Sequence, residues 1–151
     1  MEPLLFIYNP TAGKGQIVSE LSPVLDIFTK YGWLVTAYPT QCKGDAVQAA
    51  RILSPGFQRV ICAGGDGTLS ETVSGLMELG HPPVLGYIPF VSTSDCDATL
   101  ELPRKPRLAA AVAAGDGTPV PSDIGRLNGH TFVYVAAFGA FTKFAYGTPQ
   151  D

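Results

Sequence analysis

Short apolar runs alternate with amphipathic stretches along most of the chain. Several of the runs are apolar throughout, which is typical of strands that are buried on both faces. These runs cover residues 4–8, 33–38, 59–63 and 83–90. The stretches between them space their apolar residues three or four positions apart, which predicts helices. Helices are expected over residues 16–31, 45–53, 68–79 and 106–115, with a short one near 95–100.

Strands that alternate with helices predict an α/β fold in which helices cover both faces of a mostly parallel sheet. We therefore expect a three-layer αβα domain over residues 1–118. The pattern then changes, because residues 122–141 read as two strands joined at Asn128-Gly129, a dipeptide typical of two-residue hairpin turns. Residues 119–151 are accordingly expected to be the first hairpin of a truncated, β-rich second domain. Its strands would leave an exposed edge through which the chain could form a homo-oligomer.

Composition and charge narrow the class of protein. The 151 residues are 46% hydrophobic and 15% charged, which is typical of a globular protein. The net charge of -3 without basic blocks argues against a nucleic-acid partner. No run approaches the roughly 18 apolar residues that a transmembrane segment needs. Cys42, Cys62 and Cys96 lack the spacing of a zinc site or disulfide framework, so we expect a cytoplasmic protein, and Cys62 reads as a core residue.

Three polar loops follow predicted strands, at residues 9–16, 64–71 and 89–97. Each is rich in Gly, Ser, Thr or Asn, which offer backbone N–H groups and hydroxyls to an anion. Ligands of open α/β sheets bind beyond the carboxyl ends of the strands, and the helices that follow add partial positive charge at their N-termini. The three loops together therefore predict a phosphate-binding site.

Neither standard phosphate-binding motif fits these loops. A Walker A reading of Gly13-Lys14 fails, because Tyr8 and Gly15 occupy positions that require Gly and Ser or Thr. The dinucleotide-binding pattern G-x-G-x-x-G fails in the second loop, because Ser70 stands at its last position. The site is therefore expected to be of another type.

Asp66 is the unusual group among these loops, because a carboxylate repels a phosphate unless a cation lies between them. Mg²⁺ that is bound mainly through water and nucleotide oxygens would remove this conflict. The alternative is that Asp66 caps a helix that begins near Thr68. The two neighbouring polar loops favour the first interpretation.

The sequence resembles the diacylglycerol kinase catalytic-domain family of bacterial diacylglycerol and lipid kinases, which are related to sphingosine kinases and NAD kinases. The motifs that carry the resemblance are Asn9-Pro10-Thr11-Ala12-Gly13, Thr40, Gly64-Gly65-Asp66-Gly67-Thr68 with Glu71, and residues 86–103 and 123–141. The Gly-Gly-Asp-Gly-Thr segment alone is shared with NAD kinases and the wider phosphofructokinase-like group. The first motif and the closing hairpin favour the lipid kinases. The resemblance implies a phosphofructokinase-like, NAD kinase-like N-terminal domain.

The resemblance also implies a nucleotide site for ATP and Mg²⁺ between the loops. The residues that it implies for nucleotide binding are Asn9, Pro10, Thr11, Ala12, Gly13, Thr40, Gly65, Asp66, Gly67, Thr68, Leu69, Ser70, Glu71 and Ser92. Asp66 and Asp95 would belong to a water-Mg²⁺ network near the transferred phosphate. The metal ligands themselves are not identified from the sequence.

Two residues depart from the family pattern. Val91 stands where the family has Gly, and Ser94 stands where it has Asn. If the backbone there requires a positive φ, Val91 costs roughly 1–2 kcal/mol or moves the loop. Ser94 lacks the amide group that can both donate and accept a hydrogen bond. Both changes would disturb the approach of a phosphate.

The function that follows from the resemblance is an ATP-dependent lipid kinase, of which this chain carries the ATP-binding part. The acceptor would be a diacylglycerol-like lipid, reached by peripheral contact with a membrane. Family members are longer and have a C-terminal β-sandwich that supplies the general base, so we expect no catalytic base here and little or no activity from this chain alone. The alternatives are a truncated or degenerate nucleotide-binding module without turnover, and an NAD kinase-like enzyme.

Overall fold

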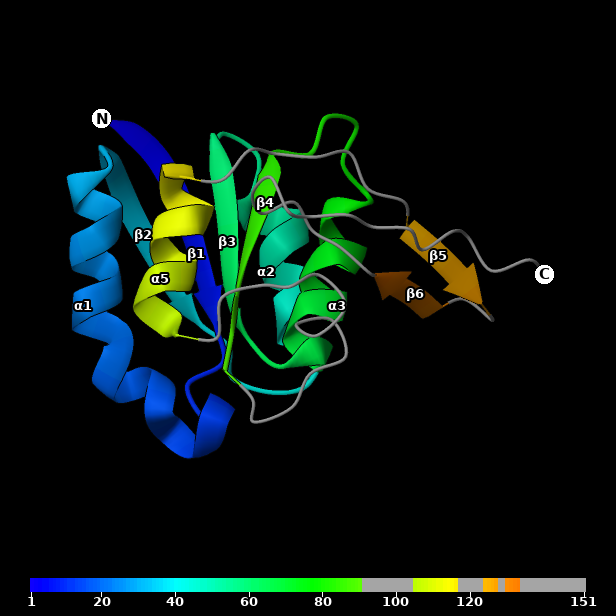
Figure 1. Cartoon of the computed structure of the whole chain (residues 1–151). Helices are drawn as coiled ribbons and strands as arrows, with labels where there is room; N and C mark the ends of the chain where they lie inside the picture. Colours follow the sequence, from blue (N-terminus) through cyan, green and yellow to red (C-terminus); the bar gives the residue numbers. More distant parts are fainter. Residues whose placement is uncertain (91–104, 117–123, 128–129, 134–151) are drawn as a thin grey trace.

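The computed structural model describes residues 1–90, 105–116, 124–127 and 130–133. Strands and helices alternate through most of these ranges (Figure 1). The strands are β1 (Glu2–Tyr8), β2 (Trp33–Pro39), β3 (Arg59–Gly64), β4 (Val84–Pro89), β5 (Ile124–Leu127) and β6 (His130–Val133). The helices are η1 (Ala12–Gly15), α1 (Gln16–Lys30), α2 (Asp45–Leu53), α3 (Asp66–Leu76) and α5 (Pro106–Ala111), which η2 (Val112–Asp116) continues.

Strands β1 to β4 form one parallel sheet in the order β2-β1-β3-β4. Tyr8 lies beside both Pro39 of β2 and Ala63 of β3, so the three strands end at the same level. This sheet confirms the α/β fold and the four predicted strands. The carboxyl ends of the strands lie at the lower edge of the sheet in Figure 1.

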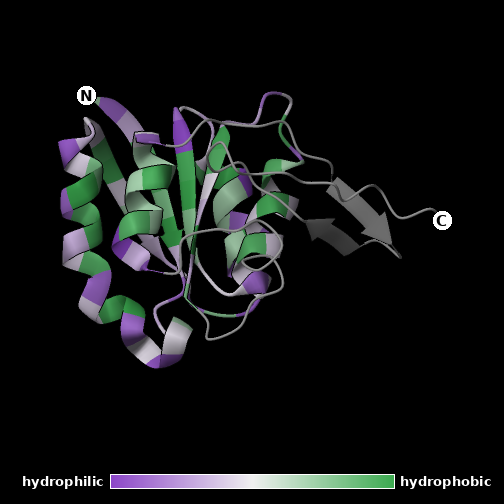
Figure 2. Cartoon of the chain, in the orientation of Figure 1, coloured by the Kyte–Doolittle hydropathy of each residue, from purple (hydrophilic) through white to green (hydrophobic). Residues whose placement is uncertain are grey.

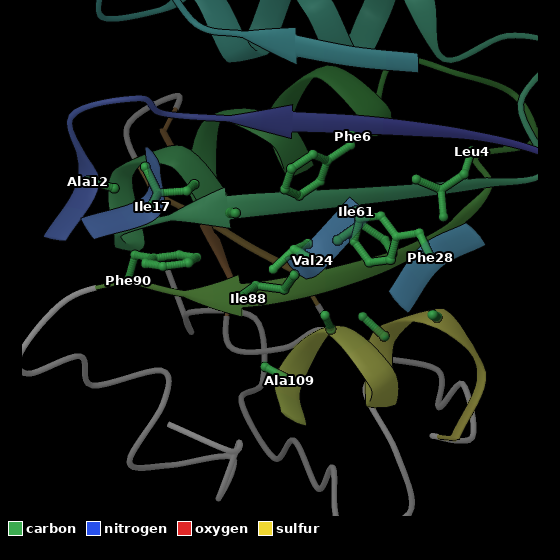
Figure 3. Close-up of a cluster of buried hydrophobic side chains, with 14 residues drawn as sticks. Leu4, Phe6, Ala12, Ile17, Val24, Phe28, Ile61, Ile88, Phe90 and Ala109 are labelled. Carbon is green, nitrogen blue, oxygen red and sulfur yellow. The ribbon is translucent and has the colours of Figure 1, made fainter. Parts of the chain in front are cut away.

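Helices cover both faces of the sheet because successive strand residues point to opposite sides. Leu4 and Phe6 of β1 belong to a buried cluster with α1 and α5, whereas Leu5 and Ile7 belong to one with α2 and α3. Figure 3 shows the first cluster, in which Phe28 packs edge-on against Phe6. The hydropathy colouring in Figure 2 follows this arrangement, with apolar residues concentrated in the strands and on the helix faces toward them. The three layers are those that the sequence predicts.

The hairpin and the element bounds agree with the sequence in most respects. β5 and β6 pair antiparallel with Leu127 opposite His130, in agreement with two strands within residues 122–141. Helix α3 begins at Asp66, two residues before the predicted start, because Gly67 is tolerated in a first turn that lacks intrahelical N–H bonds. The expected helix near 95–100 and the division at residues 118 and 119 lie outside the described residues.

Within the ranges that the structure describes, no helix combines the length and the hydrophobicity needed to cross a bilayer. The longest of them, α1, has 15 residues, whereas a membrane span takes roughly 20.

Gly75 sets the distance between α2 and α3. A Cβ atom at this position would lie 2.4 Å from the carbonyl oxygen of Val47 and 2.7 Å from the Cβ of Ala50. Both atoms belong to α2, and backbone cannot move aside as a flexible side chain can. The two helices therefore approach closely only because this position has no side chain.

We expect Gly75→Ala to lower the free energy of unfolding by about 1–2 kcal/mol, although Ala is the better helix former. Overpacking typically costs about 1–3 kcal/mol, which exceeds the gain in helix propensity of about 1 kcal/mol. Urea unfolding followed by circular dichroism measures the change. Gly80→Ala is the matched control, because a Cβ atom there meets nothing within 4 Å. Equal effects of the two substitutions would contradict the explanation.

Candidate functional site

The order of the strands opens a crevice at the carboxyl edge of the sheet. The chain leaves β1 toward α1 on one face, whereas it leaves the neighbouring β3 toward α3 on the other. Ligands of open α/β sheets bind at such switch points. The backbone hydrogen bonds between neighbouring strands continue one residue beyond the ends of β1 and β2. The N–H of Asn9 donates to Ala63 O at 3.0 Å, and the N–H of Thr40 donates to Tyr8 O at 2.8 Å. The loops after β1, β2 and β3 therefore begin side by side.

A cavity of about 560 Å³ lies between these loops. It is lined by Asn9, Pro10, Thr11, Thr40, Gln41, Cys42, Lys43, Gly67, Thr68 and Glu71. Seven of these residues were predicted from the sequence. Gln41, Cys42 and Lys43 were not, although their position directly after β2 and Thr40 was a signal that could have found them. Among the described lining residues, Lys43 carries the positive charge and Glu71 the negative one.

Gly64 and the residues after it form a compact turn at the end of β3. The φ of Gly64 is 155°, and a Cβ atom on Gly64 would lie 2.7 Å from Thr68 Oγ1. The carbonyl oxygen of Gly64 accepts hydrogen bonds from the hydroxyl of Tyr87 and from the N–H of Phe90, both at 3.0 Å. Gly67, in contrast, meets nothing within 4 Å of its Cβ position and lines the cavity. Gly64 is therefore required because a side chain would clash with Thr68, whereas Gly67 lines the cavity without a side chain that would fill it.

The N-terminus of α3 points into the cavity through Gly67 and Thr68. Leu69 N–H donates the first intrahelical bond, to Gly65 O at 3.2 Å, so the N–H groups of the first helical residues have no acceptor within the helix. Gly65 is the N-cap and no side chain caps this end. The hypothesis that Asp66 caps the helix is therefore wrong, because Asp66 is itself the first helical residue, with an exposed side chain.

The loop after β1 is organised by Asn9. Its side-chain oxygen accepts hydrogen bonds from the N–H of Thr11 at 3.0 Å and from the Thr11 hydroxyl at 2.9 Å. The backbone then becomes left-handed at residues 13–15, where Lys14 has a φ of 58°. A residue with a side chain typically costs 1–2 kcal/mol in this conformation. Such strain is concentrated at functional sites.

The remaining predicted residues have different positions. Ala12 and Leu69 have side chains buried in the two cores, so only their backbone could meet a ligand. Gly13, Gly65, Asp66 and Ser70 adjoin the cavity in sequence but do not line it. Val91, Ser92, Ser94 and Asp95 lie outside the described residues.

Two carboxylates hold the loop after β2. Glu71 of α3 accepts the N–H of Gly44 at 3.0 Å and that of Ala46 at 3.3 Å, one on each oxygen. Asp45 accepts the N–H of Gln41 at 2.8 Å and the hydroxyl of Tyr38 at 3.1 Å. The Asp45 carboxylate raises the pKa of Tyr38 above its ordinary value, mainly through this hydrogen bond and also through burial of the ring.

The carboxylates present fit a Mg²⁺ ion that is bound mostly through water and phosphate oxygens. In the part of the chain that the structure describes, no three His, Cys, Asp or Glu side chains gather into a metal site. Each oxygen of Glu71 accepts a backbone N–H, and Asp66 is an exposed residue next to Gly67, which lines the cavity. Mg²⁺ commonly keeps several waters and takes only one or two protein carboxylates. Asp66 is the described residue that would hold it.

A parallel α/β sheet with a cavity at its switch point is typical of ligand-binding α/β proteins. Comparison with known protein families identifies which ligand-binding α/β family this is. Residues 3–127 match the model of the diacylglycerol kinase catalytic domain. The chain therefore belongs to the diacylglycerol kinase catalytic domain family, as its motifs predict.

Individual relatives agree with this assignment. The chain is 39% identical to a diacylglycerol kinase of Bacillus subtilis strain 168 over 99% of its own length and 50% of the relative's. It is 40% identical to a diacylglycerol kinase of Staphylococcus haemolyticus over 95% and 44% of the two lengths. A crystal structure of a diacylglycerol kinase from Bacillus anthracis strain Sterne superposes with a TM-score of 0.76 at 29% identity, covering 87% of this chain and 45% of that one. The chain spans about half the length of the curated relatives it matches.

The hydrogen bond between Tyr38 and Asp45 predicts that the free energy of unfolding depends on pH in the alkaline range. The pKa of Tyr38 is higher in the folded state than in the unfolded state. The contribution of the Tyr38–Asp45 hydrogen bond to the free energy of unfolding is therefore fully present below pH 10 and is lost as the pH rises through the raised pKa. The difference in free energy of unfolding between wild type and Tyr38→Phe should therefore be constant from pH 7 to 9 and shrink above pH 10. Urea unfolding measures this difference. Tyrosinate absorbance of the two proteins gives the titration directly, and ionisation of Tyr38 below pH 10 would contradict the prediction.

Proposed function

We propose that the chain binds Mg-ATP in the cavity at the carboxyl edge of the sheet and is the nucleotide-binding part of a lipid kinase. The observation that carries the proposal is the cavity itself. It joins the loops after β1, β2 and β3 and receives the N-terminus of α3. A helix N-terminus whose dipole is directed into one cavity is suited to bind phosphate.

Distinct parts of the cavity suit distinct parts of the nucleotide. The N-terminus of α3 receives phosphates through backbone N–H groups, and Lys43 adds a full positive charge. Thr40 lies on the adenosine side. Asp66 is the described residue that would hold Mg²⁺, and the ion, when bound, would neutralise charge on the phosphates. Phosphoryl transfer then depends on position and charge stabilisation more than on covalent chemistry by the protein.

The acceptor that we propose is the hydroxyl of a diacylglycerol-like lipid. The family and the names of the relatives support this class of acceptor over NAD. Such a lipid resides in a bilayer, so the active protein would contact a membrane peripherally from the cytoplasm. Because the named relatives are about twice as long as this chain, binding and transfer need separate tests.

Nucleotide binding is expected to protect Cys42 from alkylation, because this exposed thiol lines the cavity. In a Cys96→Ser background, Mg-ATP at ten times its dissociation constant should slow the reaction of Cys42 with iodoacetamide about tenfold. Mass spectrometry of the labelled peptides gives the rate. Cys62 is buried and reports global unfolding in the same sample.

Two lysines provide a matched control for this experiment. Lys43→Ala should raise the ATP concentration for half-protection about tenfold, since a charged hydrogen bond to phosphate contributes roughly 1.4 kcal/mol or more. Lys14→Ala removes an exposed lysine that does not line the cavity, and should leave the value unchanged. Absence of saturable protection at millimolar ATP would identify a degenerate module and overturn the proposal.

Phosphoryl transfer separates the lipid kinase from the alternatives. The 151-residue chain, given Mg-ATP and diacylglycerol in mixed micelles, should show little or no sustained formation of phosphatidate. Radiolabelled ATP and thin-layer chromatography measure the product. Sustained turnover on diacylglycerol would prove this expectation of low activity wrong while supporting the acceptor. Sustained phosphorylation of NAD would overturn the lipid assignment.

A further inference from the structure

Glu71 spans two helices at the edge of the cavity. It lies on α3 within the first two turns, yet its carboxylate reaches the N-terminus of α2, 27 and 25 residues away along the chain. Its two oxygens accept the N–H groups of Gly44 and Ala46. These two bonds place a negative charge on the positive end of α2.

The N-terminus of α2 has no cap of its own. The N-cap residue is Gly44, which has a φ of 89° and no side chain to accept a helix N–H. A glycine N-cap leaves the first N–H groups of the helix without a side-chain acceptor of their own. Glu71 supplies the absent acceptor from another helix.

This contact also fixes one wall of the cavity. Residues 40–43 line it and lead directly into Gly44. Asp45 holds the first part of the same loop by accepting the N–H of Gln41. Thr40 is fixed to β1 by the bond from its N–H to Tyr8 O at 2.8 Å. Glu71 ties the far end of the loop to α3, whose Gly67 and Thr68 also line the cavity.

The direction of the Glu71 carboxylate matters for a phosphate ligand. A carboxylate that faced a phosphate in the cavity without a cation or N–H partner would repel it. Two N–H donors and the α2 dipole hold the charge of Glu71 against backbone instead. Each bond uses one acceptor site on a Glu71 oxygen and holds the carboxylate against the backbone at the start of α2.

We propose that Glu71 is a positioning residue, which fixes residues 40–43 as the wall of the nucleotide cavity by capping α2 and does not ligate Mg²⁺ or contact phosphate. The ligand in this statement rests on the proposed function, whereas the capping role does not. Glu71 therefore acts on nucleotide affinity through the loop, and its effect is independent of the metal.

Amide exchange tests the capping role without any nucleotide. Glu71→Ala should speed hydrogen exchange at Gly44 and Ala46 about tenfold or more, measured by NMR, because both lose their acceptor. Alkylation of Cys42 should accelerate in the Cys96→Ser background while that of Cys62 changes less. Glu71→Gln retains one acceptor oxygen and should give intermediate values. Unchanged exchange and unchanged Cys42 reactivity in Glu71→Ala would overturn the proposal.

Nucleotide affinity separates positioning from metal ligation. Glu71→Ala should raise the dissociation constant of ATP about tenfold both with Mg²⁺ and with EDTA, as judged by protection of Cys42. A loss seen only with Mg²⁺ would mean that Glu71 is a metal ligand and would overturn the proposal. If ATP does not protect the wild type, the proposed function fails, and the exchange rates still decide the capping role.

Glu78 provides the matched control. It lies two residues beyond the end of α3 and forms a 3.7 Å ion pair with Arg51 of α2, far from the N-terminal ends of both helices. Glu78→Gln should leave Cys42 reactivity, exchange at Gly44 and ATP affinity unchanged. Equal effects of Glu78→Gln and Glu71→Gln would show a general loosening of the helix pair and would count against a specific role for Glu71.

Discussion

The rest of the structure depends on the parallel register of β1, β2 and β3. Tyr8 lies level with Pro39 and with Ala63, so three chain segments leave the sheet at one edge. In the order β2-β1-β3-β4, the connection from β1 to β2 runs in one direction along the sheet and the connection from β3 to β4 runs in the other. Because both crossovers are right-handed, they leave toward opposite faces of the sheet. The loops cannot close over each other there, and the cavity is the space between them. Its position therefore follows from strand order, before any side chain is considered.

The cavity is suited to an anion although several acids surround it. Asp45 and Glu71 direct their carboxylates at backbone N–H groups around the start of α2. Their charges thereby stabilise protein structure, and the N-terminus of α3 and Lys43 line the cavity together with Glu71. Asp66 is a third acid, an exposed residue in the first turn of α3. A carboxylate in that place is compatible with phosphate when a cation lies between the two.

Much of the fold and part of the site could be predicted because they rest on local patterns. The strands are short apolar runs, and the helices repeat their apolar residues at helical spacing, so both are visible without tertiary information. The start of α3 was misplaced because glycines indicate a loop, whereas the first turn of a helix tolerates them. Gln41, Cys42 and Lys43 were missed because they form no motif. They reach the site only because β2 lies beside β1.

The sequence by itself determined the element types, the three-layer class, the family and the loops that supply the site, since each is encoded by residues close together in the chain. Only the tertiary structure decided what the individual acids do. Glu71 and Gly44 are 27 positions apart, and no spacing rule relates them. Their contact exists because α2 and α3 pack closely on one face of the sheet. The role of a charged side chain depends on which backbone groups lie within about 3 Å of it, and that is a property of packing.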